Sequence, residues 1–475
     1  MKRQPAKVRA LLHRRTEVVR SCPLIDRTIR MDINTGDTAW ILMSSALVLL
    51  MTPGLAFFYG GMVRSKSVLN MLMMSMLTIG IVTPLWVLFG FSLAFGNEHA
   101  NGFIGDFSAV GLSDMLDKVA VNGGEYPIPI LVFAAFQLMF AVITPALISG
   151  AIADRAKFSA WAVFVAVWVT VVYFPVAHWV FGFGDADGNG AGWLAKWGVL
   201  DFAGGTAVHV NAGAAGLALA IVLGKRVGWR RDQMRPHSLP LVMLGAGLLW
   251  FGWFGFNAGS ALGANGAAAM AFMNTQVATA TAMLGWLLVE KIRDGHPTTL
   301  GAASGAVAGL VAITPSCASV TPVGSIALGL TAGALCSYAV GLKYRLGFDD
   351  SLDVVGVHLV GGAVGSILIG LLAAPSSVAG ATGILYGGGA DGFSLLGKQT
   401  VAVLAVGGFS FVMAFIIGKL IDLTIGFRIE EDDEVAGIDQ VAHAETAYDL
   451  HQAFGGARTG LVAPTPASEK EKVDA

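Results

Sequence analysis

VHVNAGAAG at residues 208–216 and VHLVGGAVG at residues 357–365 are two copies of one motif, V-H-[VL]-x-[AG]-G-A-x-G. Their histidines, His209 and His358, are 149 residues apart. Each histidine lies in a long stretch of apolar and small residues. The motif therefore predicts a chain built from two related halves, with one histidine at the matching point of each half.

The composition places both copies in a lipid bilayer. Of 475 residues, 55% are hydrophobic and only 13% are charged, whereas soluble domains carry roughly 25% charged residues. The 62 glycines agree with this, because small residues allow transmembrane helices to pack closely. A formal net charge of −2 gives no reason to expect a nucleic-acid partner.

Hydrophobic runs separated by polar loops predict an all-α membrane protein with eleven transmembrane helices, since about 20 apolar residues span a bilayer. The two motif copies fall in the fifth and tenth runs, which predicts a five-plus-five repeat with an extra C-terminal helix. Because five is odd, the second half must be inverted, and inverted repeats place their substrate site near the midplane. The predicted helices are 39–62, 69–96, 127–152, 159–181, 203–223, 238–258, 267–289, 299–316, 323–342, 353–373 and 400–423.

Positive charge is distributed unevenly over the predicted loops. Lys and Arg gather in the odd-numbered loops, and Arg230, Arg231 and Arg235 are examples, while the even-numbered loops hold only Lys118, Lys196 and Lys398. Because Lys and Arg accumulate on the cytoplasmic side, we expect an outer N-terminus and a cytoplasmic C-terminus. The expected location is the cell membrane.

Three regions follow from these patterns. Residues 1–35 form a basic N-terminal extension with nine Lys or Arg before residue 31, and this extension is either a mis-assigned start or disordered. Residues 36–427 form the membrane domain. Residues 428–475 form a polar, acidic cytoplasmic tail whose last part is expected to be disordered.

At 1.5 Å per residue, His209 lies roughly 12 Å below the outer end of its helix and His358 roughly 8 Å above the inner end. Both are at membrane depth, but contact between them stays open. A histidine in a helix bundle can simply hydrogen-bond a neighbouring backbone. Two histidines in one repeated frame favour a functional role, since ionisable residues inside membranes tend to mark transport paths.

Six motifs in order resemble the ammonium transporter family (Amt/Mep, related to the Rhesus glycoproteins), from about Trp40 to Tyr448. They are TPGLAFFYGG at 52–61, FQLMF at 136–140, DFAGGTAVHVNAG at 201–213, GWFGFNAGS at 252–260, SGAVAGLVAITP at 304–315 and DVVGVH at 353–358. The resemblance implies a homotrimer with one pore per subunit. It also implies an outer recruitment site, a phenylalanine gate and twin pore histidines.

The resemblance assigns site residues by motif. Recruitment falls to Phe181, Phe256, Ser260, Trp179 and Asp201, and the pore gate and lining fall to Phe136, Phe140, Phe256, Trp253, His209, His358 and Thr314. Phe181 stands where bacterial relatives usually have Trp, the strongest cation–π partner, so Trp179 is a substitute candidate. Asp201 has a second interpretation as a helix N-cap, and capping is the favoured role for Asp353.

The tail resembles the family's regulatory element, which contacts a neighbouring subunit and couples the pores to a PII signalling protein. Asp439, His443, Glu445 and Tyr448 keep that motif, whereas Ala444 replaces a usual Gly. PII is therefore an expected partner at the cytoplasmic face.

These patterns favour an ammonium transporter that recruits ammonium, deprotonates it at the Phe gate and passes ammonia, with or without a relayed proton. Two alternatives remain, a passive ammonia gas channel and an ammonium sensor acting through PII. No nucleophile–base pair, metal cluster or cofactor loop occurs in the sequence, so neither an enzyme nor a cofactor or metal is expected.

Overall fold

The computed structural model describes residues 33–122, 124–185 and 190–448. Within these residues nine helices are long and apolar enough to cross a membrane. The predicted extension lies outside the described residues as far as residue 32, and so does the end of the tail from residue 449. The nine spans are Thr35–Met62, Val68–Phe95, Ile130–Ile152, Phe158–Phe181, Gly205–Leu223, Leu239–Gly259, Pro322–Leu346, Val355–Leu372 and Gly389–Thr424.

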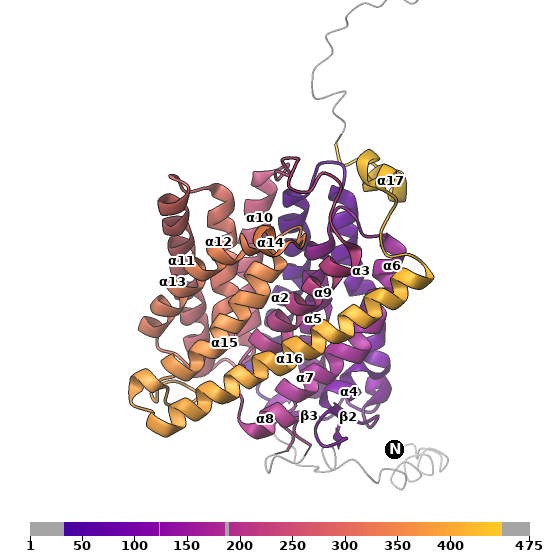
Figure 1. Ribbon diagram of the computed structural model, residues 1–475. Coiled ribbons are helices and arrows are strands. Elements are labelled where there is room, and N and C mark those ends of the chain that lie inside the picture. The colour runs from indigo at the N-terminus through magenta and orange to yellow at the C-terminus, as the bar shows by residue number, and fades with distance from the viewer. Residues whose placement is uncertain (1–32, 123, 186–189, 449–475) are drawn as a thin grey trace, which may run out of the picture.

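Several spans are composite, because short π or 3-10 turns interrupt or extend the α-helix. Such π turns are rare and often occur at functional sites. Figure 1 shows the spans packed side by side as a helical bundle. The elements of the nine spans are α2 (Thr35–Met62), α3 (Val68–Leu85), η1 (Trp86–Gly90), α4 (Phe91–Phe95), α5 (Ile130–Ser149), η3 (Gly150–Ile152), α6 (Phe158–Trp168), η4 (Val169–Tyr173), α7 (Phe174–Phe181), η5 (Gly205–Val210), α9 (Asn211–Leu223), α10 (Leu239–Gly259), α13 (Pro322–Ala339), α14 (Leu342–Leu346), η6 (Val355–Leu359), α15 (Val360–Leu372) and α16 (Gly389–Thr424).

The other two predicted spans also coincide with helices. Helix α11 (Gly266–Arg293) is long but includes polar residues such as Asn274 and Thr275, and α12 (Thr299–Ile313) has 15 residues, fewer than a bilayer core requires. The crossing of all eleven helices therefore stays a prediction, as do the inverted repeat and the orientation.

The last helix is much longer than its predicted range of 400–423. Helix α16 begins at Gly389 and has 36 residues, so it is about 54 Å long at 1.5 Å per residue. Figure 1 shows it running diagonally across the bundle, which is how a helix of this length fits beside shorter ones. The polar residues Asp391, Lys398 and Gln399 in its first turns explain why hydrophobicity alone placed the start too late.

Short elements decorate the two ends of the bundle. Two small antiparallel sheets, β1–β2 and β3–β4, lie between α4 and α5 and add strands to an otherwise helical fold. Figure 1 places β2, β3 and α8 at one end, and α17 at the opposite end. The elements are β1 (Glu98–His99), β2 (Ile104–Gly105), η2 (Val110–Leu112), β3 (Val119–Val121), β4 (Glu125–Pro129), α8 (Trp193–Trp197), η7 (Ile384–Tyr386), α17 (Glu431–Ala436) and α18 (Ile438–His443).

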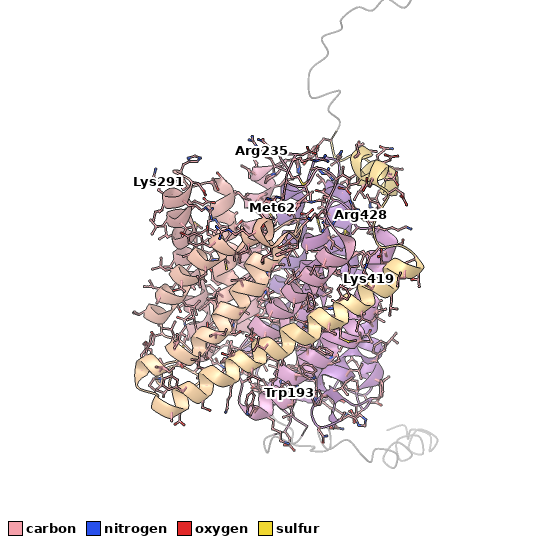
Figure 2. The ribbon with its side chains drawn as sticks, viewed as in Figure 1. Met62, Trp193, Arg235, Lys291, Lys419 and Arg428 are labelled. Carbon is pink, nitrogen blue, oxygen red and sulfur yellow. The ribbon has the colours of Figure 1, made fainter. Side chains whose placement is uncertain are left out.

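Glycine permits a close helix crossing between α2 and α10. A Cβ on Gly245 would lie 2.2 Å from the backbone nitrogen of Phe58, so no other residue fits there without a backbone shift. This is the close packing expected of helices in lipid. Figure 2 shows Arg235, Lys291 and Arg428 toward the α17 end and Trp193 at the α8 end.

Candidate functional site

The two histidines contact each other at the centre of the bundle. His209 comes from η5 and His358 from η6, and their Nδ1 atoms are 3.3 Å apart, with the ring centroids 5.4 Å apart and the planes inclined by 20°. Both side chains are buried. One Nδ1 must carry hydrogen and the other must accept it, so the question that the sequence left open is answered by direct contact.

The carboxylate of Asp201 holds the start of the turn that carries His209. It accepts hydrogen bonds from the backbone nitrogens of Gly204, Gly205, Thr206 and Ala207, at 2.6 to 3.2 Å. The Thr206 hydroxyl donates to the same carboxylate. These contacts confirm the capping interpretation of Asp201.

For η6 the predicted cap is wrong. The side chain of Asp353 accepts instead from Lys343 Nζ at 2.6 Å, while the buried carboxylate of Asp350 accepts from the nitrogens of Val354 and Val355 at 3.1 and 2.8 Å. Asp350 is 149 residues after Asp201, the same offset as the histidines. The repeat spacing could have found Asp350, whereas the search for an acid next to the predicted helix start found Asp353.

A small cavity lies beside the histidine pair. Its volume is about 10 Å³, close to the least that holds one water molecule. Apart from the two imidazoles it is lined by apolar and aromatic side chains. The lining residues are Met51, Leu55, Ile143, Leu147, Val208, His209, Leu249, Trp253, Phe256, Val307 and His358.

A column of buried aromatic rings leads from this cavity. Phe140 and Phe256 have ring centroids 4.3 Å apart, and Phe136 lies 4.9 Å from Phe140. Phe256 is 6.1 Å and Trp253 5.4 Å from the ring of His209. The structure therefore brings together five of the residues predicted for the gate and lining.

The two predicted hydroxyls lie near the same column. Ser260 is partly exposed and its Oγ donates to the carbonyl of Phe256 at 2.9 Å, which leaves its lone pairs open to a donor. Thr314 Oγ1 accepts from Trp253 Nε1 at 2.8 Å and donates to the Leu310 carbonyl at 2.7 Å. Thr314 therefore fixes the indole that packs on His209.

Trp179 and Phe181 lie apart from these rings. Trp179 packs against Phe103, Trp193 and Phe409, and its Nε1 donates to the Phe103 carbonyl at 2.7 Å. Phe181 is nearly buried, and a Cβ on Gly204 would lie 3.4 Å from its ring tip. In the part of the chain that the structure describes, neither residue has a ring contact with Phe256.

The tail is docked on the α17 end of the bundle. Asp439 accepts from the backbone nitrogens of Leu69 and Asn70 at 3.0 and 2.8 Å, at the start of α3, where the N-cap residue makes no side-chain cap. His443 Nε2 lies 3.0 Å from Asn70 Oδ1. The tail carboxylate thus supplies the cap that the sequence of α3 lacks.

The remaining tail residues make single contacts. The backbone nitrogen of Glu445 donates to the Asp439 carbonyl at 3.3 Å, and the Tyr448 hydroxyl lies 2.8 Å from His237 Nε2. Ala444 has φ of 55°, a left-handed conformation that favours glycine. This backbone conformation accounts for the usual Gly at that position of the motif.

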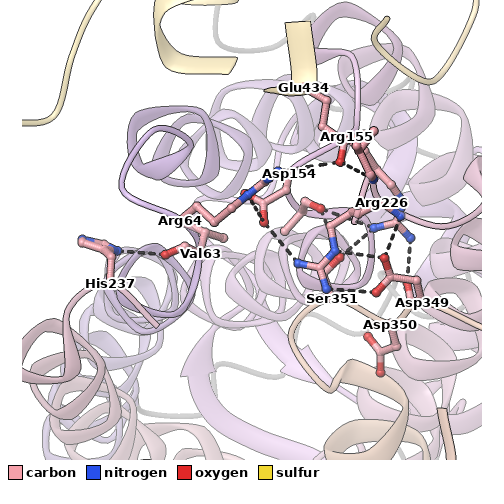
Figure 3. A network of polar contacts seen from close by, with 12 residues as sticks. Val63, Arg64, Asp154, Arg155, Arg226, His237, Asp349, Asp350, Ser351 and Glu434 are labelled. Atoms are coloured by element: carbon pink, nitrogen blue, oxygen red, sulfur yellow. Dashed lines mark hydrogen bonds and ion pairs between the residues drawn. The ribbon is translucent and has the colours of Figure 1, made fainter. Parts of the chain in front are cut away.

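A buried ionic network lies at the α17 end of the bundle (Figure 3). It contains none of the predicted site residues. Arg226 binds Asp349 with Nε and Nη2, both at 2.9 Å, and Asp154 at 3.1 Å. Arg155 donates to the Asp349 carbonyl at 2.6 Å and to Ser351 Oγ at 2.6 Å. The sequence places Arg155 and Arg226 in two separate odd-numbered loops and does not show that these loops meet in the folded chain.

The network shifts the pKa values of its members. Burial lowers the pKa of Arg155 to about 10. Burial alone would raise the pKa of Asp349, but its hydrogen bond to Arg226 and the charge of Arg226 outweigh that and lower it. For Asp350 burial prevails and raises the pKa to about 6, although the charge of Lys343 opposes the shift.

Comparison with known proteins gives consistent matches over nearly the whole described chain. A family model described as the Ammonium Transporter Family matches residues 39–448. An ammonium transporter of Mycobacterium bovis is 58% identical over 442 residues, covering 88% of this chain and 91% of that protein.

Solved structures match at lower identity. The crystal structure of Candida albicans Mep2 is 34% identical with a TM-score of 0.77, covering 85% of this chain and 88% of that one. A structure called Sensor Amt Protein is 29% identical with a TM-score of 0.78, covering 86% and 98%.

Proposed function

The chain belongs to the ammonium transporter family, and from that premise we propose that it recruits ammonium, deprotonates it at an aromatic gate and conducts ammonia past a histidine pair. The observation that carries this proposal is the His209–His358 contact beside a cavity with otherwise apolar walls. The family is one of transporters or channels.

Recruitment falls to groups that suit a small cation with four N–H donors. The face of Phe256 offers a cation–π contact of about 2 kcal/mol when desolvated, and the open lone pairs of Ser260 accept hydrogen bonds. Phe181 belongs to the same mouth in this proposal, whereas Trp179 is given a packing role because the rings of Phe103, Trp193 and Phe409 pack against it. Asp201 acts through the backbone that it caps.

The gate consists of Phe140 and Phe256, with Phe136 behind them. Rings 4.3 Å apart leave no room for a hydrated ion, and a bare charge is costly to bury. Ammonium therefore gives up a proton at or near the gate, either to water on the outer side or to the histidine pair that relays it, and continues as ammonia. Potassium has no proton to lose, so the same gate rejects it.

Beyond the gate, the imidazoles of His209 and His358 accept from and donate to ammonia, or relay the released proton separately. Trp253, fixed by Thr314, packs on His209 and keeps its ring plane constant. We propose a cell-membrane location, a homotrimer with one pore per subunit, an outer α8 end and a cytoplasmic α17 end. Asp439 and His443 would hold the tail on α3, and the docked tail would present the exposed Glu445 and Tyr448 to a PII signalling protein.

Two alternatives differ in what moves. A passive gas channel carries ammonia without charge, and a sensor reports occupancy to PII with little flux. The similarity to the structure called Sensor Amt Protein supports the sensor as an alternative. The acceptor hydroxyl of Ser260 beside Phe256 favours a site for charged ammonium over a pure gas pore.

The test is the current on a solid-supported membrane after an ammonium pulse to proteoliposomes. We expect a current from the native protein and its loss, or loss of selectivity over potassium, when His209→Asp and His358→Asp are combined. His296→Asp, at an exposed histidine, is the matched control. No native current with ammonia-driven pH equilibration intact would favour the gas channel, and full current and selectivity in the double variant would remove the histidines from the mechanism.

A further inference from the structure

Gln399 of α16 lies inside the bundle, where its side chain holds the loop that precedes η5. The internal repeat does not account for this contact, because α16 lies outside both halves. Gln399 is completely buried. Its Oε1 accepts from the backbone nitrogen of Leu200 at 2.8 Å, and its Nε2 donates to the carbonyl of Leu200 at 2.7 Å. The amide thus pairs with both backbone groups of one residue.

The second hydrogen of the same amide reaches the other half of the chain. Nε2 also donates to the carbonyl of Ser366 at 3.1 Å. Ser366 lies on α15, which continues from the turn that carries His358. The donor capacity of the amide is therefore used in full, and a single side chain from α16 joins the segment before the first motif copy to the residue that follows the second.

Leu200 directly precedes the aspartate that caps η5. A displacement of Leu200 moves Asp201, and Asp201 holds four consecutive backbone nitrogens of the turn leading to His209. The clamp thus acts on the α8 end of the pore through two covalently adjacent residues.

We propose that Gln399 is a positioning residue for ammonium entry, which sets the place of the Asp201 turn relative to the histidine pair without touching the substrate. This inference rests on the proposed function. It gives α16 a role in the pore beyond packing, because the three bonds to Leu200 and Ser366 come from this helix and not from either repeat.

Two features separate positioning from packing. A buried amide that served only to join helices would affect stability, as polar contacts in bundles commonly do. A positioning amide should instead change the ammonium concentration that gives half-maximal current, because misplacing groups by fractions of an ångström weakens capture.

Gln399→Met keeps length and volume but removes all three bonds. We expect its half-saturating ammonium concentration to rise about 5- to 10-fold, with a smaller change in maximal current. Thr400→Val is the neighbouring control, because Thr400 bonds only to Leu396 of its own helix. Ser410→Ala is the second control. The Ser410 hydroxyl also donates to a residue outside α16, the carbonyl of Asn211, which directly follows η5.

Gln399→Glu provides a second test, including the case in which the Met variant fails to reach the membrane. A carboxylate can still accept from Leu200 but cannot donate, so entry should be impaired at neutral pH. Acidic outer pH should restore part of it relative to the native protein, since a protonated carboxyl regains one donor.

The outcomes are decisive in either direction. A raised half-saturation in both Gln399 variants, with native values in Thr400→Val and Ser410→Ala, supports the proposal. Native half-saturation with only a lower melting temperature overturns it, and so does an equal shift in Ser410→Ala, which would indicate general loosening of α16. Absence of current in the native protein would instead contradict the proposed transport function itself.

Discussion

The turns η5 and η6 have closely similar backbones but very different surroundings. Each begins after a residue with positive φ, Gly204 at 116° and Asp353 at 64°, and the backbone nitrogen four residues later donates to that residue's carbonyl at 2.9 Å in both. Each is capped by an aspartate at the repeat offset. The backbone geometry therefore follows the repeated sequence.

The supports around the two caps do not follow the repeat. At the α8 end the neighbour of Asp201 is held by the neutral amide of Gln399. At the α17 end Asp350 lies beside Lys343 and Asp353, next to the buried pair of Arg226 and Asp349. The same kind of turn can therefore be held by a neutral amide or by paired charges. We expect η5 and η6 to respond differently to substitution and to pH for this reason.

The largest effect is expected from removing the charge balance. Arg226→Met leaves Asp349 and Asp154 buried without their main partner, which should destabilise the protein by about 3–5 kcal/mol. The measurement is thermal unfolding in detergent, monitored by the labelling of Cys317 and Cys336, whose thiols are buried in the folded protein. Arg230→Met, at an exposed arginine of the same loop, is the control. Equal stability of the two variants would contradict the role of the network.

A second comparison removes each cap. Asp201→Ala strands four backbone donors and one hydroxyl, whereas Asp350→Ala strands two backbone donors. We expect a loss of about 3–4 kcal/mol for Asp201→Ala and about half of that for Asp350→Ala. The same thermal assay measures both, and the reverse order would show that donor number does not govern these caps.

The pH dependence should distinguish the two ends. The pKa of Asp350 is raised by burial to about 6 from 3.8, so the folded state holds a proton that the unfolded chain has released. Its contribution is complete below pH 4 and is lost as the pH rises to about 6, by at most roughly 3 kcal/mol.

The measurement is the melting temperature between pH 4 and 7 for the native protein and for Asp350→Asn, whose neutral side chain should flatten this slope. Asp349, with its lowered pKa, contributes in the opposite direction and only below this window. A slope that persists unchanged in Asp350→Asn would assign the pH dependence to another group.

The smallest effects concern the two positive-φ residues. Gly204→Ala should cost about 2 kcal/mol, because φ of 116° disfavours a Cβ and that atom would lie 2.7 Å from the Val208 side chain. Asp353→Gly should change stability by less than about 1 kcal/mol, since relief at φ of 64° offsets the lost contact with Lys343. Equal losses of stability in the two variants would contradict the expected strain from a Cβ at Gly204 and the expected relief of strain at Asp353.

Much of the fold could be predicted because hydrophobic runs of sufficient length have few alternatives to helices. All eleven predicted ranges fall on helices, although the start of α16 was placed too late because its first turns hold polar residues. The interruption of helices by π turns could not be predicted, since these turns depend on tertiary contacts of the local backbone. Buried aspartates hold η5 and η6, whereas η1 and η4 contain no aspartate.

The site divides in the same way. The phenylalanines, Trp253 and the histidines were predicted by motif and are found in one column. Asp353 was assigned the cap that Asp350 makes, and Trp179 belongs to a separate aromatic cluster. Gln399 had no motif to mark it, because its partners are backbone atoms of distant residues.

The sequence by itself determined the membrane helices, the two matching histidines and the family, because hydrophobicity, spacing and motif are properties of the linear chain. Only the tertiary structure decided that the histidines touch, that loops far apart in sequence share buried charges and that α16 clamps the Asp201 turn. The physical reason is that hydrogen bonds and ion pairs depend on distances of about 3 Å between atoms, and helix packing alone fixes those distances.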